Sequence, residues 1–151
     1  MHFGMSALEL EQVAGKPTVV STNRKGEKNH QYDGWSVRYS KELEKVVEFG
    51  FTPRTEVIYQ DISVFKDVDA FQKIISLDGD AFEYVGFIVL LKLGITLTGF
   101  HDGDESQKAI TAFAQGRWDH LKEKFRQFPS YGKAEKIVAT TGRRDANQKQ
   151  K

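Results

Sequence analysis

The apolar runs of this chain are short, and the longest of them, residues 85–91, is interrupted by Gly86. A helix that crosses a membrane needs about 20 apolar residues, so we expect no such helix here. Short runs separated by polar, glycine-containing segments are typical of brief strands and helices joined by turns. We therefore expect a domain built from many short elements.

Composition sets the size of that domain. The 151 residues are 39% hydrophobic and 12% aromatic, which is enough for one hydrophobic core and argues against disorder. The sequence has no cysteine, which excludes a disulfide framework, a thiol nucleophile and a thiolate zinc site. The first eight residues lack the basic and apolar segments of a secretory signal. We expect a cytoplasmic protein without a membrane contact.

The clearest local signal is a helix start near the N-terminus. Ser6 and Glu9 have the spacing of a capping box, and Leu10, Val13 and Ala14 follow with helical spacing. The sequence therefore predicts a helix over residues 6–14. It further predicts a strand at residues 17–22, a hairpin loop at 23–29, and an antiparallel pair formed by the alternating residues 35–39 and by residues 45–51.

A similar order follows in the second half. Asp67 or Asp69 begins a predicted helix that runs to Leu77, and Asp78-Gly79 ends it. Predicted strands follow at residues 86–91, 95–100 and 109–114, and the first of these is apolar enough on both faces for the sheet centre. A last helix is predicted from one apolar stripe. Its members are Trp118, Leu121, Phe125 and Phe128, and Pro129 ends it.

These elements predict an α+β fold: a mostly antiparallel sheet with two or three short helices packed on one face. Residues 5–51 and 67–114 share the order of a capped helix, a loop and strands, which suggests a tandem helix-plus-strands repeat. We expect residues 1–130 to form this single domain. We expect residues 131–151 to be a flexible basic C-terminal tail.

Charge is distributed unevenly between these two parts. The chain has a net charge of +1, but residues 131–151 hold six basic and two acidic side chains, so the first 130 residues carry −3. Near-neutrality argues against nucleic-acid binding over the whole surface. The tail lacks the aromatic residues of a single-strand binder, and its role stays open.

No residue pattern in the sequence indicates a particular enzymatic reaction. The four histidines do not have metal-ligand spacing, and the chain has no glycine-rich nucleotide motif and no calcium-binding loop. We therefore expect no metal, no cofactor and no catalytic residue. The alternative is a small hydrolase in which His101 acts with Asp102 and Asp104, because a carboxylate can orient an imidazole.

Two acidic segments are the best candidates for a binding site. Asp78, Asp80 and Glu83 lie where the second helix leads into a strand, and another acidic group follows the strand at residues 95–100. Adjacent strands would bring both groups to one edge, where they would attract a cationic partner. The predicted partner-binding residues are Asp78, Asp80, Glu83, His101, Asp102, Asp104 and Glu105.

Two stretches carry a family resemblance. Residues 3–17 (FGMSALELEQVAGKP), continued by residues 37–39 and 45–49, resemble the opening of small bacterial repeat domains of the SmpA/OmlA type and of β-lactamase-inhibitor-like modules. Residues 95–102 and 112–119 resemble uncharacterised bacterial immunity proteins of polymorphic toxin systems. Both resemblances imply a binding scaffold without catalysis. The chain departs from the lipoprotein pattern because it has no lipobox cysteine.

These expectations combine into one functional hypothesis. The chain is predicted to be a non-catalytic immunity- or inhibitor-type protein that presents acidic loops to a basic toxin or other partner. The small hydrolase is one alternative, and an envelope assembly domain, which requires a signal sequence upstream of Met1, is another. The oligomeric state and the binding face stay open.

Overall fold

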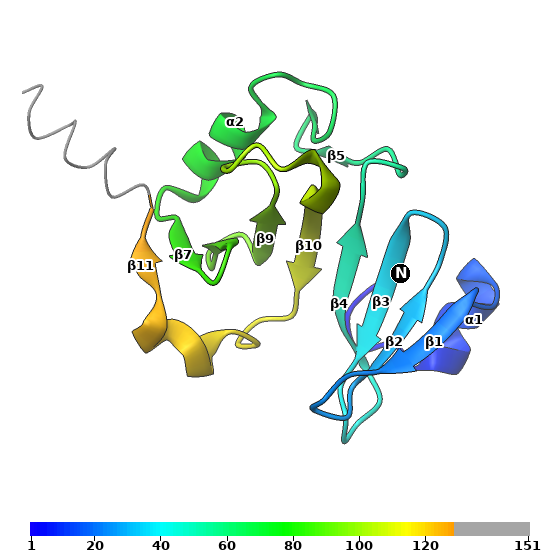
Figure 1. Cartoon of the computed structure of the whole chain (residues 1–151). Helices are drawn as coiled ribbons and strands as arrows, with labels where there is room; N and C mark the ends of the chain where they lie inside the picture. Colours follow the sequence, from blue (N-terminus) through cyan, green and yellow to red (C-terminus); the bar gives the residue numbers. More distant parts are fainter. Residues whose placement is uncertain (129–151) are drawn as a thin grey trace, which may run out of the picture.

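The computed structural model describes residues 1–128 (Figure 1). The predicted tail at residues 131–151 lies outside this part of the chain. The fold is α+β, with one large antiparallel sheet, as predicted. Short elements dominate throughout, and the longest helix has nine residues.

The first half contains one helix and four strands. Helix α1 (Ala7–Ala14) begins at the predicted capping box: Glu9 N donates to Ser6 Oγ, and Ser6 N donates to Glu9 Oε1 at 2.8 Å. The strands are β1 (Val19–Thr22), β2 (Lys28–Gln31), β3 (Trp35–Tyr39) and β4 (Val46–Phe51). Strand β2 was not predicted, because its buried residue is His30 and it has no apolar alternation.

The second half contains one α-helix, a small hairpin and five further strands of the main sheet, the last of which, β11, is described below. Helix α2 (Ala70–Asp78) ends at Gly79, which has the left-handed conformation (φ 80°). The strands are β5 (Ile58–Tyr59), β6 (Ile62–Ser63), β7 (Phe82–Tyr84), β8 (Phe87–Leu90), β9 (Ile95–Thr98) and β10 (Ala109–Phe113). The 3₁₀ turn η1 (Glu105–Gln107) precedes β10. Within residues 1–128, strands β5 and β6 pair only with each other.

The two halves join through β4 and β10. The order in the nine-stranded sheet is β1-β2-β3-β4-β10-β9-β8-β7-β11, and every pairing is antiparallel. Strand β4 pairs with β10, so Phe49 lies opposite Ala112 and Phe51 lies opposite Ile110. The central strand is therefore β10. The prediction that the apolar run of β8 lies at the centre was wrong, although β8 is an interior strand with three buried residues.

Both α-helices pack on the same face of the sheet, which we call the apolar face. Leu10 of α1 lies in one cluster with Val37 and Phe49, and Ile74 of α2 lies in another with Ile88 and Leu97. Phe51 contacts both clusters, so the apolar layer is continuous. Side chains on alternate strand positions point to the opposite side, the polar face.

The predicted C-terminal helix is not an α-helix. A 3₁₀ turn, η2 (Asp119–Lys124), leads instead into strand β11 (Arg126–Gln127), which pairs with β7. This pairing provides hydrogen-bond partners for the backbone of β7. It also places Phe125 and Phe128 on opposite faces of the sheet, since residues three apart on a strand point to opposite sides. Phe125 contacts Phe82, whereas Phe128 contacts Phe71 of α2.

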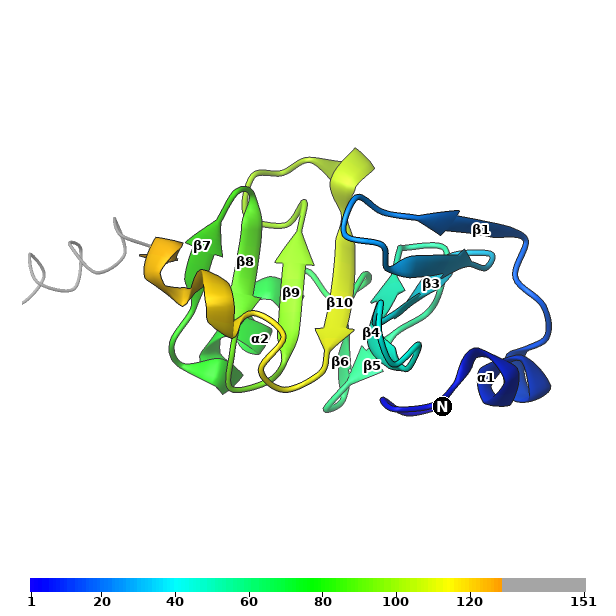
Figure 2. The ribbon, with the colours of Figure 1, turned by 90° about the horizontal axis from the view of Figure 1, so that it is seen from below.

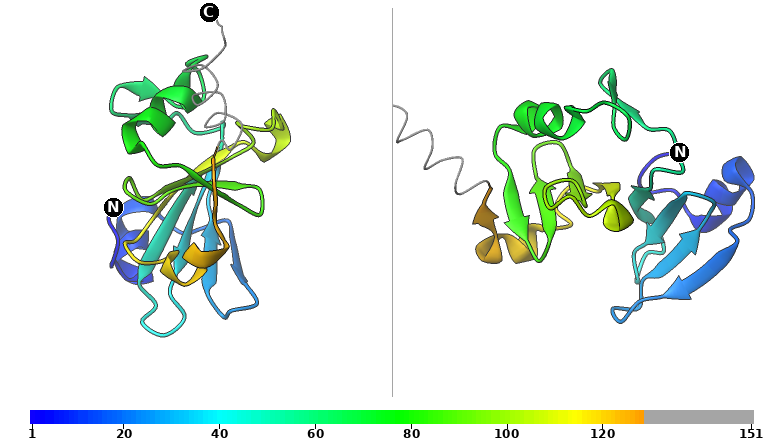
Figure 3. Two further views of the ribbon diagram at one scale, coloured as in Figure 1. Left: turned by 90° about the vertical axis from the view of Figure 1, so that its left-hand side faces the viewer. Right: turned by 45° about the horizontal axis from the view of Figure 1, so that its top comes forward.

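The segment that contains η2 therefore lies on the side opposite α2. Figure 2 shows this orange segment in front of the sheet and α2 behind it, and the left view of Figure 3 shows the two on opposite sides of the sheet seen edge-on. The prediction of helices on one face is correct for α1 and α2 and wrong for the C-terminal segment.

Candidate functional site

The polar face carries a groove of about 530 Å³. We call it the polar-face groove. Its floor is a row of short side chains across four neighbouring strands, because Ser36, Gly50, Thr111 and Thr96 lie opposite one another in the registers of β3, β4, β10 and β9. A Cβ atom at Gly50 would meet Ser36 Oγ at 3.2 Å and Thr111 Oγ1 at 3.4 Å. The hollow therefore exists because this row has no large side chain.

Two segments form the walls of the groove. The loop between β1 and β2 supplies Arg24 and Lys25, and the C-terminal segment supplies Trp118 and Leu121. Trp118 is fixed by edge-on contacts with Tyr84 and Phe87, at 6.3 and 5.5 Å between ring centroids. One wall is thus basic and the other is aromatic and apolar.

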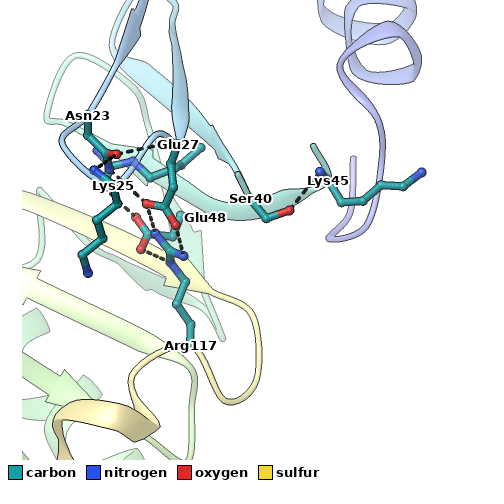
Figure 4. Close-up of polar contacts among 8 residues, drawn as sticks. Asn23, Lys25, Glu27, Ser40, Lys45, Glu48 and Arg117 are labelled. Atoms are coloured by element: carbon teal, nitrogen blue, oxygen red, sulfur yellow. Dashed lines mark hydrogen bonds and ion pairs between the residues drawn. The ribbon is translucent and has the colours of Figure 1, made fainter. Parts of the chain in front are cut away.

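Arg117 connects the two walls through a largely buried ion cluster. Its Nη1 and Nη2 donate to Glu27 Oε2 and Oε1 at 2.8 and 2.9 Å, and its Nε donates to Glu48 (Figure 4). Side-chain exposure is 18% for Arg117, 12% for Glu27 and 17% for Glu48. We call these three residues the Arg117 clasp, since they tie the β1–β2 loop to the chain that follows β10.

Hydrogen bonding and charge shift the pKa values of this cluster. The hydrogen bonds from Arg117 lower the pKa of Glu27 to about 2 and outweigh its burial, which acts in the opposite direction. Burial of the Arg117 guanidinium favours its neutral form, but the bonds to Glu27 and Glu48 are stronger and raise its pKa above the ordinary value. Glu27 and Arg117 are therefore both charged across the physiological range.

The β1–β2 loop is further ordered by Asn23. Its Oδ1 accepts hydrogen bonds from Lys25 N and Glu27 N, both at 2.9 Å, and its Nδ2 donates to Glu27 Oε1 at 3.0 Å. Gly26 completes the turn with φ 86°. Arg24 and Lys25 are exposed on a loop whose backbone is held in place.

Among the predicted site residues, Asp78 has a structural role. It is buried, and its carboxylate accepts hydrogen bonds from the backbone N–H groups of Asp80, Lys92 and Leu93 at 3.0 to 3.1 Å. It thereby ties the end of α2 to the β8–β9 turn. Asp80 is half-buried.

Glu83 and His101 do come together, but on the apolar face. His101 Nε2 lies 3.8 Å from Glu83 Oε2, and the imidazole side chain is 10% exposed. Its ring packs against Phe71 and Phe128, at 6.5 and 5.7 Å between centroids. The nearest carboxylate partner of His101 is thus Glu83, whereas the hydrolase hypothesis named Asp102 and Asp104.

The other three predicted residues form an exposed turn. Asp102, Asp104 and Glu105 are all exposed. Asp104 Oδ1 accepts bonds from Ser106 N and Oγ, and Glu105 pairs with Lys108 at 3.1 Å. This acidic turn is ordered by its own contacts and is accessible to a partner.

Sequence reasoning missed the Arg117 clasp and the groove. One signal was present: Ser36 and Arg38 alternate with apolar residues in β3, as Glu48 and Gly50 do in β4, which marks a polar face. The position of Arg117 over these strands depends on the β4–β10 pairing, which no local pattern indicates.

Residues 1–128 bring together no group of three metal-ligating side chains. Within the same residues, no helix is long and apolar enough to cross a lipid bilayer. No protein-family model, no curated protein and no solved structure matches this chain. The fold and the groove therefore define it only as an α+β protein with one helix-covered face and one hollowed, polar face.

Proposed function

We propose that this chain is a non-catalytic protein-binding module of the immunity or inhibitor type, and that its partner docks on the polar-face groove. The observation that carries the proposal is the row of small residues across β3, β4, β10 and β9, enclosed by two walls that the Arg117 clasp holds together. A rigid hollow on a sheet face accepts a partner at little conformational cost.

The two carboxylates of the groove, Glu27 and Glu48, are suited to binding and not to proton transfer. A general base needs a pKa near the working pH, but hydrogen bonds from Arg117 hold the pKa of Glu27 at about 2. Glu48 is committed to Arg117 and Arg38. These charges stabilise one geometry, which favours a docking surface over a small hydrolase.

The exposed acidic turn is the second contact surface in this proposal. Asp102, Asp104 and Glu105 stay exposed and would meet basic groups of a partner. We retain a basic toxin as the partner for this surface and a cytoplasmic location as part of the same hypothesis. The two halves, each a helix followed by a four-strand meander, are proposed to be a tandem repeat.

Photo-crosslinking in the source cells tests where a partner docks. Benzoylphenylalanine is placed at Arg24 or Leu121 on the walls of the groove, where it leaves the floor open, at Asp104 in the acidic turn, and at Val13, which is 67% exposed on α1, as the control. We expect the groove positions to crosslink to one protein that the Val13 position does not reach. The proposal fails if the groove positions capture no protein.

Binding of the purified partner then tests whether the floor of the groove is the docking surface. Gly50→Leu fills the floor and should weaken the affinity by at least about a hundredfold, as expected for a blocked interface centre. Leu8→Ala, on the exposed side of α1, should leave affinity unchanged. Protection from the partner's toxicity should follow the same order. Equal affinity of the two variants would show that the groove is not the docking site.

A further inference from the structure

We infer that the segment of the partner that enters the polar-face groove is an extended acidic peptide segment, whose carboxylates pair with Arg24, Lys25 and Arg38. This inference rests on the proposed function and adds the chemistry of the occupant. It differs from the acidic-turn hypothesis, because it assigns negative charge to the partner at this surface.

The first argument is the charge of the groove. Four cations, Arg24, Lys25, Arg38 and Arg117, line it, and only two carboxylates, Glu27 and Glu48, oppose them. Arg117 is matched by both carboxylates in the clasp. The other three basic side chains, Arg24, Lys25 and Arg38, lie in a protein whose first 130 residues have a net charge of −3. The groove is thus a local basic hollow in an acidic body, and it would attract negative charge.

The second argument is the geometry of Arg38. It projects from the middle of β3 on the polar face, and its side chain is 34% exposed. Its Nη1 has one long contact, 3.9 Å from Glu48 Oε1, and its Nε is buried without a hydrogen-bond partner within residues 1–128. A guanidinium presents five N–H donors in a plane, so Arg38 retains donors for an incoming carboxylate.

The third argument is that the basic wall is preorganised. Asn23 and the Arg117 clasp fix the loop that carries Arg24 and Lys25, and neither of these two cations has a salt-bridge partner in the described part of the chain. Little backbone entropy is lost when a ligand meets a loop that is already ordered. Three cations along one groove fit carboxylates spaced along an extended segment.

A peptide fits better than a nucleic acid. A phosphate backbone carries one charge per nucleotide and needs a long basic track, whereas this groove offers three available cations beside the fixed negative charges of Glu27 and Glu48. The aromatic wall at Trp118 is packed by Tyr84, Phe87 and Phe125, so its rings are engaged with one another and are not spaced as separate base platforms.

Binding of defined peptides tests the inference. The probe is an eight-residue peptide that alternates Glu and Ser, and its matched control has Gln in place of each Glu. The full chain is used with all six tail cations neutralised (Lys133→Gln, Lys136→Gln, Arg143→Gln, Arg144→Gln, Lys149→Gln and Lys151→Gln), so that the tail does not supply the site. Affinity is measured by calorimetry, and the site is mapped by amide chemical shifts.

We expect the Glu peptide to bind about fiftyfold more tightly than the Gln peptide, because the Gln peptide loses the pairs with all three cations. We also expect the Glu peptide to move the resonances of Ser36, Gly50 and Thr111. Arg24→Gln with Lys25→Gln should weaken it about tenfold and Arg38→Gln about fivefold, since each lost pair is worth up to about 1 kcal/mol. The matched control, Lys16→Gln with Lys92→Gln, removes the same charge from exposed sites elsewhere and should have no effect.

Three results would overturn the inference: equal binding of the two peptides, shifts that map away from the groove, or tighter binding of an eight-nucleotide RNA or of inorganic phosphate. Because Arg24 and Lys25 are exposed, their variants are expected to fold, and their spectra check this. Failure here while the crosslinking identifies a groove partner would leave the proposed function standing with a different occupant.

Discussion

Different interactions stabilise the structure on the two faces of the sheet. On the apolar face, α1 and α2 cover a continuous layer of Val, Ile, Leu and Phe side chains, and Leu10, Ile74 and Ile88 are fully buried. On the polar face, the floor of the groove has small side chains, charged side chains lie beside it, and Phe87 and Phe113 pack against Trp118. The C-terminal segment is tied across this face by Arg117. Burial of apolar area stabilises one face, and a geometrically specific ion cluster stabilises the other.

This difference explains why the polar-face groove stays open. Apolar side chains fill any space that the strands leave, because empty volume costs packing energy. The charged groups of the Arg117 clasp are instead fixed where their hydrogen bonds are satisfied. They therefore hold the two walls of the groove apart, above a floor of Ser, Gly and Thr. The apolar face supplies most of the stability, and the polar face is left available for binding.

The largest expected effect is on the apolar face. Leu97→Ala removes a side chain that is 1% exposed between the sheet and α2, and should lower the free energy of unfolding by about 4 kcal/mol. Urea unfolding measures the change. Leu8→Ala, at a position 69% exposed, is the matched control and should change stability by less than about 0.5 kcal/mol. Similar losses for both would contradict the assigned core.

The next effect breaks the Arg117 clasp. Arg117→Gln leaves Glu27 and Glu48 buried without their cation and should cost about 3 kcal/mol. The triple variant with Glu27→Gln and Glu48→Gln removes all three charges and should be more stable than Arg117→Gln alone. Urea unfolding of both variants gives the comparison. A triple variant less stable than the single one would show that the charges do not act as a unit.

Acid should affect the polar face in a low pH window. The pKa of Glu27 is about 2 in the folded protein, and the ordinary pKa of a glutamate side chain is 4.5. A depressed folded pKa means that the stabilisation is complete above 4.5 and is lost as pH falls toward 2, a loss of about 2 to 3 kcal/mol. Unfolding midpoints between pH 5 and 2 measure it. In Glu27→Gln, this part of the pH dependence should disappear.

The smallest expected effect comes from His30, beneath α1. Burial lowers its pKa below 6.5, and Glu11, 3.9 Å away, opposes the shift only in part. The unfolded chain therefore binds a proton that the folded chain resists, so stability should fall as pH drops from 6.5 toward the lowered pKa. His30→Gln should remove this slope while the Glu27 window is retained. Coincident loss of both would show that the two faces do not titrate independently.

Local patterns predicted the elements whose signals are local. The capping box at Ser6 and Glu9, the stop at Gly79 and the alternation in β3 were sufficient for α1, the end of α2 and one strand. They failed where tertiary contacts decide. Phe125 and Phe128 have helical spacing, yet pairing with β7 makes β11 a strand and sends the two rings to opposite faces.

The same distinction applies to the candidate site. Sequence reasoning identified acidic residues, and Asp102, Asp104 and Glu105 are exposed, but Asp78 is buried among backbone donors and His101 pairs with Glu83. Whether a carboxylate is exposed or serves as an internal acceptor depends on the backbone groups that the fold brings to it. Composition and spacing do not contain that information.

By itself, the sequence determined that the chain forms an α+β domain of short elements with polar residues at alternate strand positions. It also determined that the first 130 residues have a net charge of −3. Only the tertiary structure decided where these charges meet. Glu27, Glu48 and Arg117 are up to 90 residues apart in the chain, and the β4–β10 pairing brings them into hydrogen-bond contact. Strand register is set by long-range packing of the apolar face, so the groove on the polar face follows from interactions on the opposite side of the sheet.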